Sequence, residues 1–183
     1  MPFTFNQTKI KDVIMIEAKI YPDNRGFFME TFRESFFREN GIDVKFVQDN
    51  FSHSSKNVLR GLHYQKHPTA QAKLIKVIHG EIFDVAVDMR KQSPTYGKWV
   101  GDILSEKNHK MLYIPEGFAH GFLVLSNDAD VHYKVSNEYS AENDRGILWN
   151  DPNLKINWSN NNPILSENDL KHPFLENADS NFS

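Results

Sequence analysis

Residues 73–90 read KLIKVIHGEIFDVAVDMR, the longest strand-like stretch of the sequence. It is rich in β-branched and other apolar residues, and the pair His79-Gly80 in its middle is typical of a tight turn. We therefore expect two short strands joined by a turn. Similar stretches between turn residues predict further strands at 11–21, 44–52, 57–65, 110–115, 120–126 and 130–139.

One segment has the pattern of a helix. Thr31 and Glu34 form a T-x-x-E capping box, phenylalanines share one face over residues 32–40, and Gly41 ends the segment. Many short strands in 183 residues predict an all-β sandwich or barrel with few helices, in a single domain over 1–183. The polar stretch at 177–183 predicts a loose tail.

Composition restricts the classes of function. The formal net charge of −3 gives no general attraction for nucleic acid or for a membrane surface. The absence of cysteine excludes disulfides, thiolate metal ligands and a cysteine nucleophile. Residues 1–13 lack the apolar core of a signal peptide, and no apolar run approaches the roughly 20 residues of a membrane span. We therefore expect a cytoplasmic protein without nucleic-acid or membrane partners.

Several polar residues share a strand face with apolar ones. Because side chains alternate between the two faces of a strand, Tyr133 lies on the same face as Val131 and Val135. The same alternation places four more polar residues on apolar faces: Gln48, Asn50, Lys73 and His120. Buried polar groups need partners, so several on one side of a barrel predict a ligand cavity. Each alone also fits a structural role, such as a tyrosine bonded to backbone or a lysine that reaches solvent.

The stretch VLRGLHYQ, residues 58–65, raises a question of geometry. Strict alternation puts Arg60 and His63 on opposite faces of one strand. If both serve one site, the strand must bulge or twist near Gly61, which glycine tolerates. Otherwise Arg60 reaches over from the rim, or is simply exposed beside a structural His63.

Several motifs, taken in order, resemble the dTDP-4-dehydrorhamnose 3,5-epimerase family from about residue 10 to about residue 175. They are RGLHYQ, AQAKLIKVIHGEIFDVAVDMR, SPTYGKW, PEGFAHGFLVLS, YKV, WNDP and LSENDL. The resemblance implies a cupin-type β jelly roll, usually a homodimer. It also implies action on a dTDP-linked 4-keto-6-deoxyhexose in rhamnose synthesis, without metal or coenzyme.

The resemblance further implies roles for individual residues. It makes His63 the base, Tyr133 the acid and Asp169 the partner that orients His63. Lys73 would lie near the C4 oxygen of the sugar. The implied contacts to the nucleotide and the rest of the substrate are Arg25, Glu30, Gln48, Asp49, Asn50, Arg60, His120, Tyr139, whose ring would stack on thymine, and Asp144, which stands where relatives often have glutamate.

This reaction suits these residue types. The hydrogens on C3 and C5 are both α to the C4 ketone, so inversion needs a base on one face, an acid on the other and support for an enolate oxygen. A histidine with a pKa near 6.5 can accept the proton, and a tyrosine with a pKa near 10 can deliver one. A carboxylate fixes the histidine tautomer, and an ammonium stabilises the oxyanion. Asp169 also fits a capping box with Ser166 at a short helical turn.

Three alternatives stay open. Enzymes that epimerise only C3, or that use another nucleotide-linked keto sugar, would carry similar motifs. A metal-dependent cupin such as a dioxygenase typically begins its site with H-x-H, whereas His63 is followed by Tyr64 and Gln65. His67, four residues on from His63, is weak support for a metal site. A non-catalytic sugar-binding module would need the pocket but no base opposite an acid.

Overall fold

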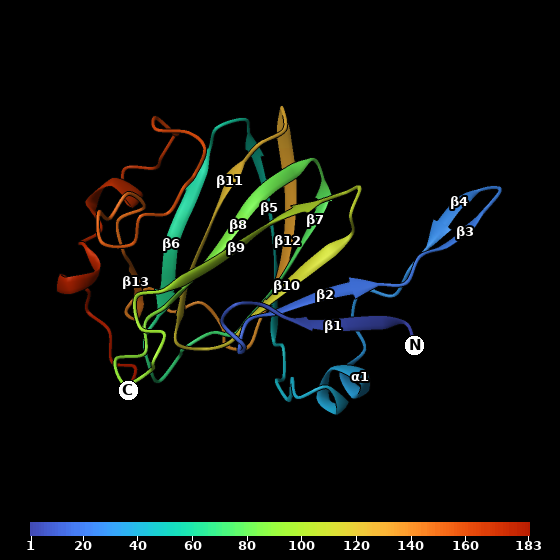
Figure 1. Ribbon diagram of the computed structural model, residues 1–183, viewed down its shortest axis with the longest axis horizontal. Coiled ribbons are helices and arrows are strands. Elements are labelled where there is room, and N and C mark those ends of the chain that lie inside the picture. The colour runs from blue at the N-terminus through green and yellow to red at the C-terminus, as the bar shows by residue number, and fades with distance from the viewer.

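The computed structural model describes residues 1–183 and consists mainly of two facing β-sheets (Figure 1). The six-stranded sheet has the order β1-β2-β10-β7-β12-β5, and the five-stranded sheet has the order β13-β6-β11-β8-β9. The expectation of an all-β sandwich with few short helices is confirmed. None of its helices combines the length and the apolar character that crossing a bilayer requires.

The strands pair antiparallel throughout both sheets. The six-stranded sheet contains β1 (Phe3–Gln7), β2 (Ile14–Ala18), β10 (Lys110–Ile114), β7 (Lys73–His79), β12 (Asp128–Val135) and β5 (Gln48–Ser55). The five-stranded sheet contains β13 (Asp144–Gly146), β6 (Leu59–Gln65), β11 (Phe118–Val124), β8 (Glu81–Asp88) and β9 (Trp99–Ser105). The remaining elements are β3 (Tyr21–Asp23), β4 (Gly26–Phe28), helix α1 (Glu34–Glu39) and the 3-10 turns η1 (Asp169–Lys171) and η2 (Leu175–Asn177).

Most strands lie where the sequence predicts them. The stretch 73–90 forms β7 and β8, with the turn at Gly80 between them. The sequence analysis missed β1, β9, β13 and the small β3–β4 hairpin. Strand β9 carries Gly101 and Asp102 at its centre, which interrupts the apolar pattern. Strand β13 has three residues and exists because β6 pairs with it, so local propensity carries little signal there.

Helix α1 is present, but the predicted capping box is wrong. The N-cap residue is Arg33 rather than Thr31, and no side chain caps the helix. Packing fixes the segment instead, because the ring of Phe32 lies 4.8 Å from that of Phe37, which is itself buried. Tertiary contacts between aromatic rings therefore outweigh the local capping signal.

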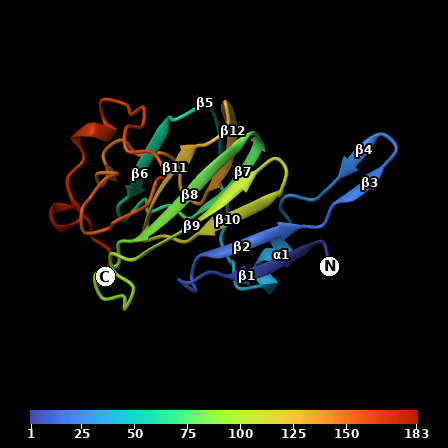
Figure 2. The same cartoon turned by 45° about the horizontal axis from the view of Figure 1, so that its top comes forward.

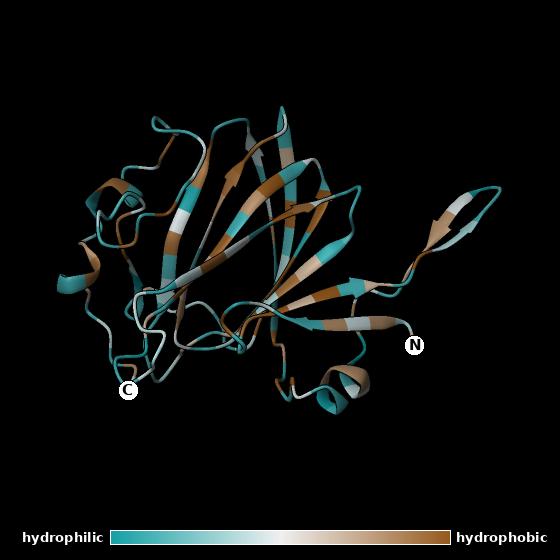
Figure 3. Cartoon of the chain, viewed as in Figure 1, coloured by the Kyte–Doolittle hydropathy of each residue, from teal (hydrophilic) through white to brown (hydrophobic).

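Apolar side chains fill the space between the sheets and also cover their outer faces. Ile75, Phe122 and Val131 belong to the core between the sheets. A second core, which includes Leu59 and Trp158, lies under the C-terminal segment that covers the five-stranded sheet (Figure 1). Hydropathic colours alternate along several strands in Figure 3, whereas all of β11 is buried because both of its faces are covered.

The polar composition of the C-terminal tail predicts a loose segment, but the tail packs against the rest of the chain. Phe182 is only 4% exposed, and its ring lies 5.3 Å from that of His67. The carboxylate of Asp179 accepts hydrogen bonds from Lys66 at 2.7 Å and from Arg145 at 2.8 Å. One apolar anchor and one carboxylate therefore hold the tail against the end of β6 and against β13.

The β3–β4 hairpin stands apart from both sheets in two views (Figures 1 and 2). Its strands pair only with each other. Phe27 is 56% exposed and Phe28 is 64% exposed. Two large apolar side chains in solvent on a projecting hairpin are typical of a contact surface.

Candidate active site

Polar residues from both sheets line one cavity of about 190 Å³. His63 and Asp144 come from the five-stranded sheet, whereas Lys73 and Tyr133 come from the six-stranded sheet. The other lining residues are Gln48, Asn50, Tyr64, Gln65, Gln71 and Tyr139. The cavity therefore brings together seven of the residues that the sequence singles out, drawn from five strands and the loop that carries Tyr139.

A β-bulge resolves the question of Arg60 and His63. In the pairing of β6 with β11, His63 lies opposite His120 and Arg60 lies opposite Phe122, so β6 has one residue more than β11. A bulge near Gly61 is thereby confirmed. Gly61 has a φ of 118°, and a Cβ there would lie 2.6 Å from the Cα of Gly121, so no side chain fits.

His63 is held by a carboxylate from a distant segment. Its Nε2–H donates to Oδ1 of Asp169 at 2.6 Å, which leaves Nδ1 free to accept a proton. Asp169 also accepts from the hydroxyl of Ser166 at 2.6 Å, and its own N–H donates to that hydroxyl at 3.1 Å. The capping box that the sequence suggests and the contact to His63 are therefore both present, on different oxygens of one carboxylate.

The environment of Asp169 keeps it ionised. The side chain is 4% exposed. Burial raises the pKa of the carboxyl, but the hydrogen bonds from His63 and Ser166 outweigh burial and lower the pKa to about 2. A permanent negative charge beside Nε2 stabilises the imidazolium that forms when Nδ1 takes a proton.

Tyr133 and Lys73 add a phenol and an ammonium to the cavity. Burial raises the pKa of Tyr133, and the nearby Arg60 guanidinium partly opposes this, so the phenol keeps its proton at neutral pH. Lys73 is 8% exposed. Burial lowers its pKa to about 8, although the carboxylates of Asp144 and Asp84 favour its charged form. The cavity thus contains a base, a protonated acid and a desolvated cation.

His120 lies next to this cavity without lining it. Its Nε2 is 3.0 Å from a carboxylate oxygen of the fully buried Asp84. Burial lowers the pKa of His120, while Asp84 opposes that shift. The pair lies within electrostatic reach of the site, since Lys73 and His63 act on the pKa of His120 and Asp84 acts on that of Lys73.

Gln48 and Tyr139 meet at the cavity. The backbone N–H of Tyr139 donates to the side-chain oxygen of Gln48 at 3.0 Å. The Tyr139 ring is 61% exposed, and its hydroxyl donates to Asp144 at 3.4 Å. An exposed ring at the edge of a polar cavity has a free face on which a planar base can stack.

Six residues expected at the site do not line this cavity. Asp169 bonds to His63, His120 lies next to the cavity, and Arg60 donates to the hydroxyl of Ser54.

The other three lie away from the cavity. Asp49 points to the opposite face of β5, where it accepts from Lys134 at 2.9 Å. Arg25 and Glu30 lie on and just after the β3–β4 hairpin, where they pair with Asp23 and Arg33 respectively. Alternation along β5 explains Asp49, because Gln48 and Asn50 on either side of it face inward.

The family model for dTDP-4-dehydrorhamnose 3,5-epimerase matches residues 7–177. The chain belongs to this family. The family, the cupin-type jelly roll and the enzyme class that the motifs indicate are therefore confirmed.

Individual members of the dTDP-4-dehydrorhamnose 3,5-epimerase family are similar over almost their whole length. The epimerase of Shigella flexneri is 54% identical over 174 residues, which are 94% of this chain and 96% of that protein. The dTDP-6-deoxy-D-glucose-3,5-epimerase of Legionella pneumophila, solved in complex with dTDP-4-keto-L-rhamnose, is 48% identical with a TM-score of 0.92 and covers 95% of this chain and 93% of its own. ChmJ of Streptomyces bikiniensis, a 3′-monoepimerase solved with dTDP-quinovose, is 33% identical with a TM-score of 0.87 over 93% of this chain and 87% of its own.

The sequence analysis missed Gln65 as a site residue in this member of the epimerase family. Gln65 is 3% exposed; its amide donates to the carbonyl of Thr69 at 2.7 Å, and its side-chain oxygen accepts from the N–H of Ser140 at 2.7 Å. It thereby ties two loops to the end of β6. Its position two residues after His63, on the same strand face, is the signal that could have found it.

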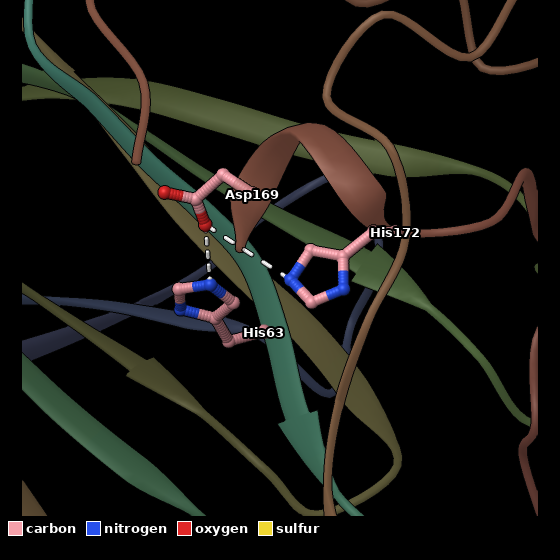
Figure 4. A group of neighbouring side chains, drawn as sticks. All are labelled: His63, Asp169 and His172. Carbon is pink, nitrogen blue, oxygen red and sulfur yellow. Dashed lines mark hydrogen bonds and ion pairs between the residues drawn. The ribbon is translucent and has the colours of Figure 1, made fainter. Parts of the chain in front are cut away.

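His172 lies outside the cavity, beside Asp169, and the sequence analysis did not single it out. Its Nε2 lies 4.0 Å from Oδ1 of Asp169, and the donor atoms of His63, Asp169 and His172 all lie within 4.8 Å of one another (Figure 4). These three are the residues of the chain that could hold a metal ion together. No spacing rule in the sequence joins them, because His63 and His172 are on separate segments.

A larger cavity lies elsewhere, between β1, β2, β9 and β10. It has a volume of about 980 Å³ and includes Glu17, Trp99 and Lys110 in its lining. No histidine or tyrosine lines it. It has nothing that corresponds to the His63–Asp169 pair facing Tyr133, so the smaller cavity is the candidate active site.

Proposed function

We propose that this chain epimerises C3 and C5 of dTDP-4-keto-6-deoxy-D-glucose to give dTDP-4-keto-L-rhamnose. The observation that carries the proposal is that His63, paired with Asp169, and Tyr133 line one cavity from facing sheets. Family membership adds independent support, since a relative at 48% identity was solved with dTDP-4-keto-L-rhamnose.

In the proposed reaction, Nδ1 of His63 removes the hydrogen on C3, and the electron pair of the C–H bond moves toward the C4 oxygen. The Lys73 ammonium stabilises the resulting enolate in a water-poor site. The Tyr133 hydroxyl then protonates the opposite face of C3. Proton exchange with water restores both residues, and the same steps at C5 complete the reaction.

The nucleotide end of the substrate needs positive charge and a stacking surface. Arg60 is suited to the diphosphate because its guanidinium lies near Tyr133 and donates to the hydroxyl of Ser54 at 2.8 Å. Tyr139 provides the exposed ring for thymine. Gln48, Asn50 and Asp144 supply hydrogen-bonding groups around the sugar.

The proposal includes a homodimer in which the hairpin of one subunit reaches the cavity of the other. Arg25 and Glu30 are expected to contact the nucleotide, yet neither lines the cavity of its own chain. Phe27 and Phe28 beside them are exposed, which favours burial against a partner. We still predict a cytoplasmic location and action without a coenzyme. Roles for Asp49 and His120 at the substrate also stay predictions.

Epimerisation at C3 alone is the second candidate function. ChmJ, a 3′-monoepimerase, has the same fold at 33% identity. The fold therefore accommodates either outcome.

Incubation with dTDP-4-keto-6-deoxyglucose in heavy water, followed by NMR, tests the proposal. The expected result is deuterium at both C3 and C5 together with inverted product at both centres. Inversion at C3 with no exchange at C5 would favour the second candidate. Binding without any exchange would contradict both and indicate a sugar-binding module.

A further inference from the structure

The third donor of the histidine–carboxylate cluster has no partner. Nε2 of His172 is shielded from solvent and makes no hydrogen bond. At 4.0 Å, its separation from Oδ1 of Asp169 is too long for one. A buried ring nitrogen that points at a carboxylate without bonding to it is unusual, because buried polar atoms are normally satisfied.

The position of the His172 ring is fixed by its surroundings. The ring packs directly on Gly146, where a Cβ would collide with Nε2. Gly146 lies opposite His63 in the pairing of β13 with β6. The chain after the ring is anchored too, since Leu148 donates its N–H to the carbonyl of Pro173 at 2.8 Å. The bare backbone of Gly146 thus lets His172 face the catalytic pair.

The three donor atoms are close to a metal-binding arrangement. Zinc binds imidazole nitrogen and carboxylate oxygen at about 2.0–2.2 Å, which in a tetrahedron separates the donors by roughly 3.4 Å. The present separations are 2.6 Å between His63 and Asp169 and 4.0 Å between His172 and Asp169. If the His63 nitrogen moves away from Asp169 and the His172 nitrogen moves toward it, each by under about 1 Å, both separations reach that value. The side chain of His63 is 39% exposed, so an ion has a route in, and a fourth ligand can be water.

We propose that His63, Asp169 and His172 form an inhibitory site for a divalent transition metal ion such as Zn²⁺. The proposed reaction does not need this ion. The inhibitory effect of the ion on turnover rests on the proposed function. Figure 4 shows both imidazoles directed at the same oxygen of Asp169. His63 comes from β6, and His172 directly follows η1, which begins at Asp169.

The mechanism of inhibition follows from the imidazole tautomer. In the free protein, Nε2 of His63 carries the proton and Nδ1 holds the lone pair that acts as base. A metal ion on Nε2 requires the lone pair there, so the single proton of the neutral ring moves to Nδ1. The ion also withdraws Asp169 from His63. Nδ1 can then no longer accept the substrate proton, although the cavity that binds the nucleotide sugar is unchanged.

Zinc binding and inhibition, measured on the same protein, test this site. Titration calorimetry with ZnCl₂ alone should show about one bound ion per chain. Kinetics with dTDP-4-keto-6-deoxyglucose should show that Zn²⁺ lowers kcat with little change in KM, because the base is lost and binding is not. A chelator should restore full activity.

His172→Phe is the decisive variant, because it keeps a ring on Gly146 and removes the nitrogen. It should retain the activity of the wild type in chelator, while its zinc affinity and its sensitivity to zinc inhibition fall by at least about tenfold. His79→Gln is the matched control, since His79 is an exposed histidine paired with Glu106 and Asp128. That control should bind zinc and be inhibited like the wild type.

Equal zinc affinity in His172→Phe and the wild type would overturn the site, as would the absence of one-to-one binding. Equal inhibition of the two proteins would do the same. A protein that binds zinc through His172 but does not epimerise the keto sugar would refute the proposed function and leave the site standing, because calorimetry does not depend on turnover.

Discussion

His63 and Tyr133 line the same cavity from opposite sheets of the sandwich, His63 on β6 and Tyr133 on β12. A substrate between the two sheets therefore has an imidazole on one side and a phenol on the other. His63 Nε2 is occupied by Asp169, and burial keeps Tyr133 protonated. The sheets thus place a proton acceptor and a proton donor as inversion of a carbon centre requires.

His63→Ala should nearly abolish exchange of the hydrogens at both C3 and C5, because both leave to one base. The expected loss of rate is roughly 10⁴-fold, the upper end of what general acid–base catalysis supplies. Deuterium incorporation measured by NMR checks it. Near-normal exchange at C3 would require another base, with His120 the first to examine. Asp169→Asn should slow exchange less, since the ring remains and only its orientation suffers.

Asp169 should also give the protein a pH-dependent stability. The pKa of its carboxyl is about 2 in the folded chain, below its ordinary value of 3.8, so its contribution is complete above about pH 4 and is lost as pH falls through 2. Urea unfolding should find the wild type about 2 kcal/mol more stable than Asp169→Asn near neutral pH, with the difference shrinking toward pH 2.

Glu167→Gln serves as the control for that measurement. Glu167 is 94% exposed and its ion pair with Lys171 spans 3.9 Å, so its removal should change stability little at any pH. If the difference between the wild type and Asp169→Asn stays constant from pH 7 to about pH 2, the hydrogen bonds to His63 and Ser166 do not stabilise the ionised carboxylate.

Lys73 should set the alkaline limb of activity. Burial lowers its pKa to about 8, so its ammonium is present below that pH and is lost above it. The pH profile of kcat/KM, which reports the free enzyme, should decline with a midpoint near pH 8. Burial raises the pKa of Tyr133, so its ionisation lies at higher pH and is not the cause. Lys73→Gln should be slow and should lack this limb. The same limb in Lys73→Gln would assign it to another group.

Metal removal should leave the reaction intact. Proton transfer among His63, Tyr133 and Lys73 requires no metal, and the H-x-H motif of metal-dependent cupins is absent from the sequence. Dialysis against a strong chelator should therefore preserve kcat and KM, or raise kcat if zinc occupies the proposed inhibitory site. Loss of activity that one divalent ion restores would contradict the proton-transfer account.

Local pattern was sufficient to predict part of the site. Period-2 alternation identified Tyr133 and Lys73 because a tyrosine and a lysine on apolar strand faces need an explanation. It also offered a bulge near Gly61 as one of the ways to bring Arg60 and His63 to one site, and the pairing of β6 with β11 contains that bulge. The strand content followed from β-branched stretches between turn residues, so the fold class was accessible from the sequence alone.

Local sequence pattern could not predict the contacts between distant segments. Asp169 was assigned to His63 through family motifs, since 106 residues separate them and no periodicity connects them. His172 was missed for the same reason. Asp49 was expected at the substrate, although alternation with Gln48 and Asn50 already placed it on the other face. The hairpin that carries Arg25 has too few residues for a propensity signal, and its position depends on the rest of the chain.

The account depends most on the claim that Tyr133 delivers the proton opposite His63. Tyr133→Phe removes the hydroxyl and keeps the ring, so the cavity and fold should survive. His63 can still remove a hydrogen and return deuterium to the same face. The quantity to measure is the ratio of solvent exchange to inversion at C3 and C5, by NMR in heavy water. The account predicts continued exchange with little inverted product, and hence a large rise in that ratio. Inversion of both centres at the wild-type rate would contradict it and make Tyr133 a packing residue.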